Sequence, residues 1–424
     1  MIWAWIAAAV IISWLFCKKE ISWYHYIWLL LPIEMYGVTI AGATLKPYML
    51  FGICIIAGDF VRNKTIRVHA AIVAIIFALI FSDYLTGSVM QHIMFILVLM
   101  IGYCYQNYQC DGIEFDEMGQ AALAATIGYG IVFTMAWLMF NHGVTADGIY
   151  ASERLDAGIV LRLASFGGNV SSRLRGFCID PNSVITTLIP GATYALANIV
   201  YRKQDIIKSL LAIVVYFAVV FYSGSRMALI CSFAMLVVFF VVGYRKSENK
   251  RRMAVAGIAS VGVLLVALII NMDTIILEVA KLWADMFGER ASLGSEYGRL
   301  TIWKTNIEYL INNSKEWFGV GQNQIYLLTE RGLACHNTWL EWICGTGIIL
   351  GAIIDFWFIL APVRFKKRSV GMGGENALPI IMAYITVVVC ISTVDNITNP
   401  VLLFLMLILR YGVINRELQT ERVV

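Results

Sequence analysis

Apolar segments long enough to cross a lipid bilayer follow one another along almost the whole chain, separated by shorter polar segments. A membrane-spanning helix needs about 20 predominantly apolar residues, and the sequence offers about thirteen runs near this length. Hydrophobic residues make up 60% of the 424 residues, above the roughly 45–50% of soluble domains. We therefore expect an all-α polytopic membrane protein with about 12–13 transmembrane helices. The predicted spans are Ile2–Phe16, Tyr24–Ile40, Pro47–Val61, Val68–Phe81, Val89–Tyr103, Gly119–Phe140, Ser183–Tyr201, Ser209–Tyr222, Met227–Tyr244, Met253–Asn271, Asn337–Val363, Leu378–Val394 and Ile397–Ile414.

Basic residues cluster in segments that follow odd-numbered spans, and this sets the predicted orientation. Cytoplasmic loops of membrane proteins carry an excess of lysine and arginine. We therefore expect the N-terminus outside and the C-terminus inside the cell. The clusters are Lys18 and Lys19; Arg62, Lys64 and Arg67; Arg202, Lys203 and Lys208; Arg245, Lys246, Lys250, Arg251 and Arg252; and Arg364, Lys366, Lys367 and Arg368.

This orientation places two long polar segments outside, residues 141–182 and the larger 272–336. Residues 1–140, 183–271 and 337–424 then supply the transmembrane helices of one integral membrane domain. The larger outer loop is expected to be partly helical, because apolar residues recur in it at helical spacing. This apolar stripe could lie on the bilayer surface or on the helix bundle. It consists of Leu300, Trp303, Ile307 and Leu310.

Several arginines fall on the predicted outer side, against the positive-inside trend. Arg173 and Arg175 precede the seventh span, and Arg226 begins the ninth after a tight turn. Arg290 and Arg299 lie in the larger outer loop. An arginine at a span end commonly extends to the lipid headgroups, which is the simpler interpretation of each. Together they would suit a lipid diphosphate, because guanidinium groups match phosphate oxygens and stay charged.

A histidine, His336, stands at the polar start of the predicted span "HNTWLEWICGTGIILGA". A lone histidine at a span end is often only a structural group. Here Asn337 and Glu341 follow it four residues apart and share one helix face. A neutral histidine can accept the proton of a hydroxyl group. Gly345, Gly347 and Gly351 would then allow close helix contact. These residues predict a site at the outer membrane surface, with His336 as the base.

The remaining motifs exclude several kinds of chemistry. The net charge of +4 is too small to suggest a nucleic-acid partner. The sequence has no nucleotide-binding glycine loop, zinc-protease motif or serine-hydrolase motif, and its cysteines lack metal-ligand spacing. We therefore expect no metal and no cofactor. Whether Cys178 and Cys335, both predicted outside, form a disulfide stays open.

Five ordered stretches resemble the O-antigen ligase and O-antigen polymerase superfamily of bacteria. They cover about Arg173 to Ala352 and read "RGFCIDPN", "SGSRMALICSFAMLVV", "GRLTIWKTNIEYL", "FGVGQNQ" and "HNTWLEWICGTGIILGA". The resemblance implies a GT-C-like membrane glycosyltransferase that acts outside the cytoplasmic (inner) membrane, needs no metal and inverts the anomeric carbon. It also implies that Arg175 and Arg226 bind the donor diphosphate and that His336 activates the acceptor, with Arg299 as a further candidate.

The donor implied by the resemblance is a glycan on undecaprenyl diphosphate. The acceptor is either the next lipid-linked repeat unit, in a polymerase of O-antigen, capsule or exopolysaccharide, or lipid A-core, in an O-antigen ligase. We favour the polymerase because such proteins are more numerous. A flippase or transporter of lipid-linked sugar is a third interpretation, but it should show broken helices and mid-membrane charges in both halves. Membrane lipids, a chain-length regulator and a flippase are the other partners considered.

Overall fold

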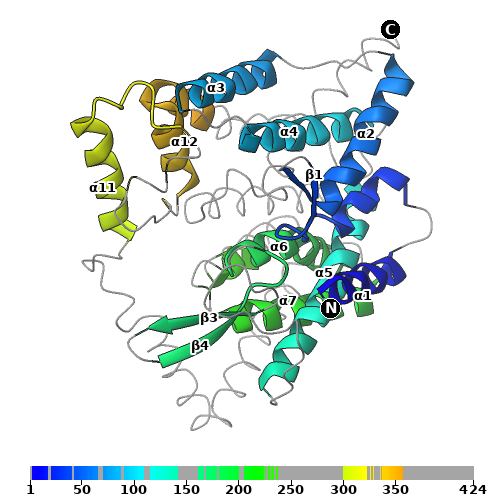
Figure 1. Ribbon diagram of the computed structural model, residues 1–424. Helices are drawn as coiled ribbons and strands as arrows, with labels where there is room; N and C mark the ends of the chain where they lie inside the picture. Colours follow the sequence, from blue (N-terminus) through cyan, green and yellow to red (C-terminus); the bar gives the residue numbers. More distant parts are fainter. Residues whose placement is uncertain are drawn as a thin grey trace, which may run out of the picture.

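The computed structural model describes a mostly helical chain (Figure 1). Two helices are long and apolar enough to cross a membrane, Glu117–Met139 and Ile206–Ser223, and shorter apolar helices occupy Ile2–Phe16, Ile96–Tyr105 and Ser183–Ala197. The described residues are 2–17, 21–40, 43–64, 70–86, 90–108, 115–141, 161–166, 169–178, 181–199, 205–223, 225, 228–229, 231–233, 235–236, 299–321, 325, 328, 335 and 337–356. The predicted spans from 253 to 271, 378 to 394 and 397 to 414 lie outside them.

Helix α5 (Phe115–Asn141) organises one group of helices, shown in the lower half of Figure 1. The helices α1 (Ile2–Phe16), α6 (Ser183–Ala197) and α7 (Ile206–Ser223) pack directly against it. Small residues allow the helices to approach closely: a Cβ on Gly191 of α6 would meet the α5 backbone at 2.2 Å. These four helices form where the sequence predicts apolar segments, and their contacts bury most of α6.

A second group consists of α2 (Pro47–Asn63), α3 (Ala70–Thr86) and α4 (Met90–Tyr108). The α2 and α4 helices pack side by side, and a Cβ on Gly52 would meet the Ile101 side chain at 2.3 Å. These helices also form at predicted apolar segments. Proline at the first position of α2 suits a helix start, because its missing N–H has no intrahelical partner there.

The second predicted span, Tyr24–Ile40, is not an α-helix, and this prediction is wrong. The segment begins as a 3₁₀-helix, η1 (Trp23–Leu29), and continues in extended form. Its start is bonded to the first turns of α5, because Glu117 Oε2 accepts a hydrogen bond from the Ser22 amide at 2.7 Å. Its middle is bonded further along α5, where the Tyr129 hydroxyl donates to a carbonyl of η1, that of Leu29, at 2.6 Å.

The end of this segment reaches the opposite half of α5. The Phe177 carbonyl accepts backbone hydrogen bonds from Glu34 at 3.2 Å and Met35 at 3.0 Å, and the Phe177 ring contacts Phe133 of α5. A 3₁₀-helix rises about 2 Å per residue and an extended chain about 3.3 Å, so a short segment covers the length of a longer α-helix. The segment therefore runs along α5 without α-helical geometry.

Two antiparallel hairpins correct the expectation of an all-α fold. The first joins β1 (Val38–Ile40) to β2 (Ala43–Leu45), directly before α2. The second joins β3 (Leu161–Phe166) to β4 (Asn169–Leu174), within the first predicted outer loop. In the second hairpin Arg162 is paired with Arg173. A hairpin pairs its own backbone groups, so these loops gain structure without a large core.

Helix α11 (Arg299–Asn312) occupies the predicted helical part of the larger loop, and it packs against α12 (Thr338–Thr346) (Figure 1). The predicted apolar stripe coincides only in part with the buried face of α11. Leu310 is buried and Trp303 is half-buried, whereas Ile307 is 45% exposed. The buried face includes a polar residue, Asn306, which the stripe omitted.

The predicted span Asn337–Val363 is interrupted at Gly347, contrary to the expectation of one continuous helix. α12 ends there because Gly347 adopts φ 88°, and helical structure resumes over residues 348–356. The turn at residues 316–321 packs into the break. Its bonds run from Val320 N to Cys344 O and Gly321 N to Gly345 O, each 2.9 Å, and from Ile348 N to Glu316 O at 2.8 Å.

The glycines of this region serve a loop contact and not the expected helix–helix contact. A Cβ on Gly347 would lie 2.0 Å from the Trp317 carbonyl oxygen, and one on Gly319 would lie 2.4 Å from the Gly345 carbonyl oxygen. Both glycines also have positive φ angles, which residues with a Cβ adopt at a cost. The glycines therefore allow the 316–321 turn to dock on the end of α12.

Candidate active site

Arg175 lies in a tight turn between β4 and α6, and the structure buries it almost completely, at 1% exposure. The turn is closed by a hydrogen bond from the Cys178 amide to the Arg175 carbonyl at 3.2 Å. Gly176 has φ +60°, and a Cβ there would meet the Phe133 ring at 2.5 Å. Because the side chain is buried, Arg175 does not extend into the headgroups, and the simpler interpretation fails for this residue.

Polar side chains from the start of the chain surround this turn. The Arg175 guanidinium lies close enough to the Tyr36 hydroxyl to interact with it. Glu34 is fully buried, and it interacts electrostatically with Lys46. Burial lowers the pKa of Lys46, and the Glu34 carboxylate opposes that shift. Burial also raises the pKa of the Cys178 thiol well above its usual range, so this thiol stays protonated.

The end of α7 is bonded to the same region. Arg173 Nε donates to the Ser223 carbonyl at 3.0 Å. The Ser225 hydroxyl donates to Asn182 Oδ1, and Ser225 Oγ accepts from the Ala228 amide at 3.1 Å, which caps the next helical turn. Asn182 precedes α6 but makes no side-chain capping bond to it. The structure thus brings Arg173 and Asn182, which lie on either side of the Arg175 turn, to the two serines that come just before residue 226 in the sequence.

Asn337 is the N-cap of α12, and its side chain accepts hydrogen bonds from Trp339 N at 3.1 Å and Leu340 N at 3.2 Å. The Glu341 amide closes the first turn on the Asn337 carbonyl at 2.9 Å. Glu341 therefore sits in the first turn, where a carboxylate favours the positive end of the helix dipole. Trp342 is buried and belongs to the large hydrophobic core of the described helices.

Four of the predicted site residues cannot be placed in this geometry. Arg226, Arg290 and His336 lie outside the described residues. Arg299 starts α11, but its side chain is not described. The two outer cysteines are both thiols: Cys178 Sγ donates to the Pro32 carbonyl at 3.7 Å, whereas Cys335 Sγ accepts from Asn306 Nδ2 at 2.9 Å.

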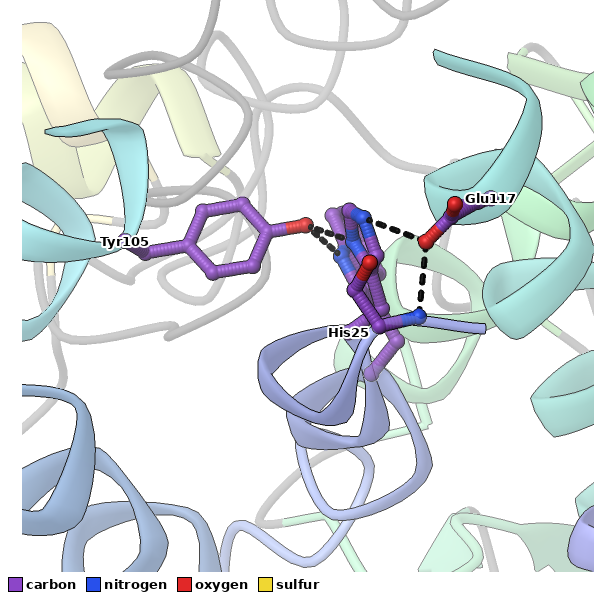
Figure 2. Close-up of polar contacts among 5 residues, drawn as sticks. His25, Tyr105 and Glu117 are labelled. Atoms are coloured by element: carbon purple, nitrogen blue, oxygen red, sulfur yellow. Dashed lines mark hydrogen bonds and ion pairs between the residues drawn. The ribbon is translucent and has the colours of Figure 1, made fainter. Parts of the chain in front are cut away.

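A second polar cluster closes the opposite end of α5, and Figure 2 shows how its side chains converge. His25 is buried, with Nδ1 2.7 Å from the Tyr105 hydroxyl and Nε2 3.5 Å from Glu117 Oε2. Trp28 Nε1 donates to the same hydroxyl at 3.0 Å. These bonds connect η1 to α4 and α5. The cluster therefore holds these three elements together.

Comparison with known families bears on the second half of the chain. Residues 211–354 match a family model described as O-antigen ligase. This part of the chain is similar to the O-antigen ligase family over residues 211–354. Proteins of this family transfer glycans, as ligases or polymerases, from lipid-linked substrates during surface-polysaccharide synthesis. The apolar helices and the family match both point to an integral membrane protein. No curated protein matches the chain.

The matched region contains the end of α7, α11 and α12, whereas Arg173 and Arg175 precede it. The chain before the matched region also supplies Glu34, Tyr36 and Lys46, which the sequence analysis missed. Glu34 gave a usable signal, since a carboxylate inside a predicted span is costly and marks a site by default. No such signal in the sequence indicated that Lys46 lies near Glu34, because that proximity depends on how the β1–β2 hairpin folds back.

Proposed function

We propose that the protein is a polymerase of undecaprenyl-diphosphate-linked oligosaccharide repeat units, of O-antigen, capsule or exopolysaccharide, acting on the outer side of the cytoplasmic membrane. The observation that carries this proposal is the attachment of the Arg173–Arg175 turn to the end of α7. The Arg173–Ser223 and Ser225–Asn182 hydrogen bonds make this attachment. It brings the chain before the matched region to Ser223 and Ser225, which come just before Arg226 in the sequence.

The arginines have a defined task in this reaction. The bond between the anomeric carbon and the diphosphate oxygen breaks, and negative charge grows on the leaving diphosphate. Fixed guanidinium groups stabilise that charge most strongly where water is excluded. Arg175 is held in such a place by the turn around Gly176. We assign Arg175 and Arg226 to the diphosphate, with Arg173, Arg290 and Arg299 binding the donor around it.

His336 would act as the base. An acceptor hydroxyl oxygen attacks the anomeric carbon from the face opposite the diphosphate, its proton passes to the imidazole, and the diphosphate leaves with the bonding electrons. This sequence inverts the anomeric carbon and uses neither metal nor cofactor. Asn337 and Glu341 would bind and orient groups at the start of α12, which Asn337 caps.

The test is glycan transfer by purified protein with a lipid-linked repeat unit as both donor and acceptor. We expect a ladder of products that is unchanged by EDTA. General-base assistance is typically worth about 10²–10⁴-fold in rate, so His336→Ala should slow transfer by about that factor. His142→Ala, at the start of the first outer loop, is the control and should retain activity. Near-wild-type transfer by His336→Ala would remove the histidine from the mechanism.

The acceptor distinguishes the polymerase from an O-antigen ligase. A ligase would ignore a second lipid-linked repeat unit and would transfer the glycan once to lipid A-core. Offering the two acceptors separately therefore separates the two functions. Movement of the lipid-linked glycan across proteoliposomes, without any new glycosidic bond, would instead show a flippase and overturn both.

A further inference from the structure

Helix α11 holds the residue that immediately precedes His336. Trp303 Nε1 donates to the Cys335 carbonyl oxygen at 2.8 Å, and Asn306 Nδ2 lies 2.9 Å from Cys335 Sγ. Trp303 and Asn306 are one turn apart on the same face of α11, so one rigid helix grips both the backbone and the side chain of Cys335. Asn306 and Cys335 are both fully buried, which strengthens these contacts.

This attachment is supported by a small hydrophobic cluster of its own. It joins α11 to α12, and Trp303 packs against it. The cluster consists of Leu310, Ile325, Leu328, Cys335, Leu340 and Cys344. Cys335 therefore belongs to the packed contact between the two helices, and its position follows that of α11.

The residue on the other side of His336 is held just as firmly. Asn337 caps α12 through Trp339 N and Leu340 N. Residue 336 thus comes between one neighbour fixed to α11 and another fixed to α12. Consecutive Cα atoms are only about 3.8 Å apart, so the fixed positions of Cys335 and Asn337 are the observations from which the inference starts.

We propose that Trp303 and Asn306 are positioning residues for His336, acting through Cys335. This inference rests on the proposed function, in which His336 is the base. A displacement of about 1 Å at a catalytic group can cost on the order of 10²-fold in rate. The contacts of α11 are of the kind that prevents such a displacement. The larger outer loop therefore serves catalysis through its helix as well as through its arginines.

The test uses Trp303→Phe, which keeps an aromatic ring in the cluster and removes only the N–H donor. We expect kcat to fall about 10-fold with little change in the KM for donor. Trp317→Phe is the matched control, because Trp317 is 58% exposed; it should leave kcat unchanged. Asn306→Ala and Asn313→Ala form a second pair, since Asn313 is exposed and its side chain donates to the Tyr309 carbonyl one turn earlier.

A double-mutant cycle separates positioning from general stability. In the His336→Ala background, Trp303→Phe should lower the residual rate less than about 2-fold, because the group it positions is gone. An undiminished 10-fold effect in that background, or no effect of Trp303→Phe in the wild type, would overturn the inference. If His336→Ala itself transfers glycan normally, the proposed function fails instead, so the two failures are distinct.

Discussion

The two ends of α5 are both closed by buried polar side chains, but these side chains differ in kind. At the Glu117 end, the histidine, tyrosine, tryptophan and carboxylate of Figure 2 bind one another directly. At the opposite end, among the residues that the structure describes, three cationic residues lie with a single buried carboxylate, that of Glu34, beside the turn that precedes α6. The cationic residues are Arg173, Arg175 and Lys46. The difference teaches that burial alone does not mark a site. A cluster whose groups bond to one another supports the fold, whereas an excess of cations over carboxylates suits an anionic ligand.

The largest expected effect is an all-or-none difference in thiol labelling. It tests whether the arginine end of α5 faces the outside of the cell. In a cysteine-free background, Ser314→Cys should react with an impermeant thiol reagent on intact cells. Lys64→Cys should react only after permeabilisation. The two positions are well matched, because both are exposed and both have φ angles near 54° (53° for Ser314 and 54° for Lys64). The reverse pattern would place the arginine end inside the cell and end the proposed function.

The next effect concerns the arginine end itself. Arg175→Ala should lower glycan transfer about 10²–10³-fold, the usual loss when one fixed donor to a developing negative charge is removed. Arg175→Lys should recover little of it, because lysine lacks the planar fork. The measurement is turnover per folded molecule, with protein amount and melting temperature recorded for each variant. Near-normal turnover by Arg175→Ala would make this buried arginine a structural residue.

The smallest effect on turnover is expected at the other end. Glu117→Gln removes the charge that faces His25 and weakens the bond to Ser22. It should lower the free energy of unfolding by about 1–3 kcal/mol and change turnover per folded molecule less than about 2-fold. Thermal unfolding and transfer assays on the same preparation measure both. A large loss of turnover with an unchanged melting temperature would show that the Glu117 end also takes part in the reaction.

Hydropathy predicts the helices well because length and apolar composition decide whether a segment becomes a membrane helix. α2 to α7 all form where the apolar segments lie. It fails for Tyr24–Ile40, since a segment largely buried against other protein segments can be apolar without being α-helical. It also fails at Gly347, where the break depends on a turn some thirty residues earlier in the chain.

For the candidate site too, the sequence predicted some features and could not predict others. Residue chemistry selected the arginines, and the structure then showed Arg175 to be buried and not in the headgroups. Sequence spacing could not show that Arg173 reaches Ser223 or that Trp303 reaches Cys335, because both contacts join distant parts of the chain. The capping role of Asn337 was easier to predict, since an asparagine before an apolar helix commonly accepts hydrogen bonds from the first backbone amides of that helix.

The 3₁₀ and extended segment beside α5 also has a consequence for how the protein is made. Backbone without α-helical bonding is tolerated within a bilayer only where protein surrounds it. For residues 22–35 the partners include Glu117, Tyr129 and Phe177, which are synthesised long after them. The segment therefore cannot adopt its final conformation when it leaves the ribosome. We therefore expect this segment to fold late. The first helix enters the membrane before α5 and the turn before α6 have been synthesised, and the segment packs only after them.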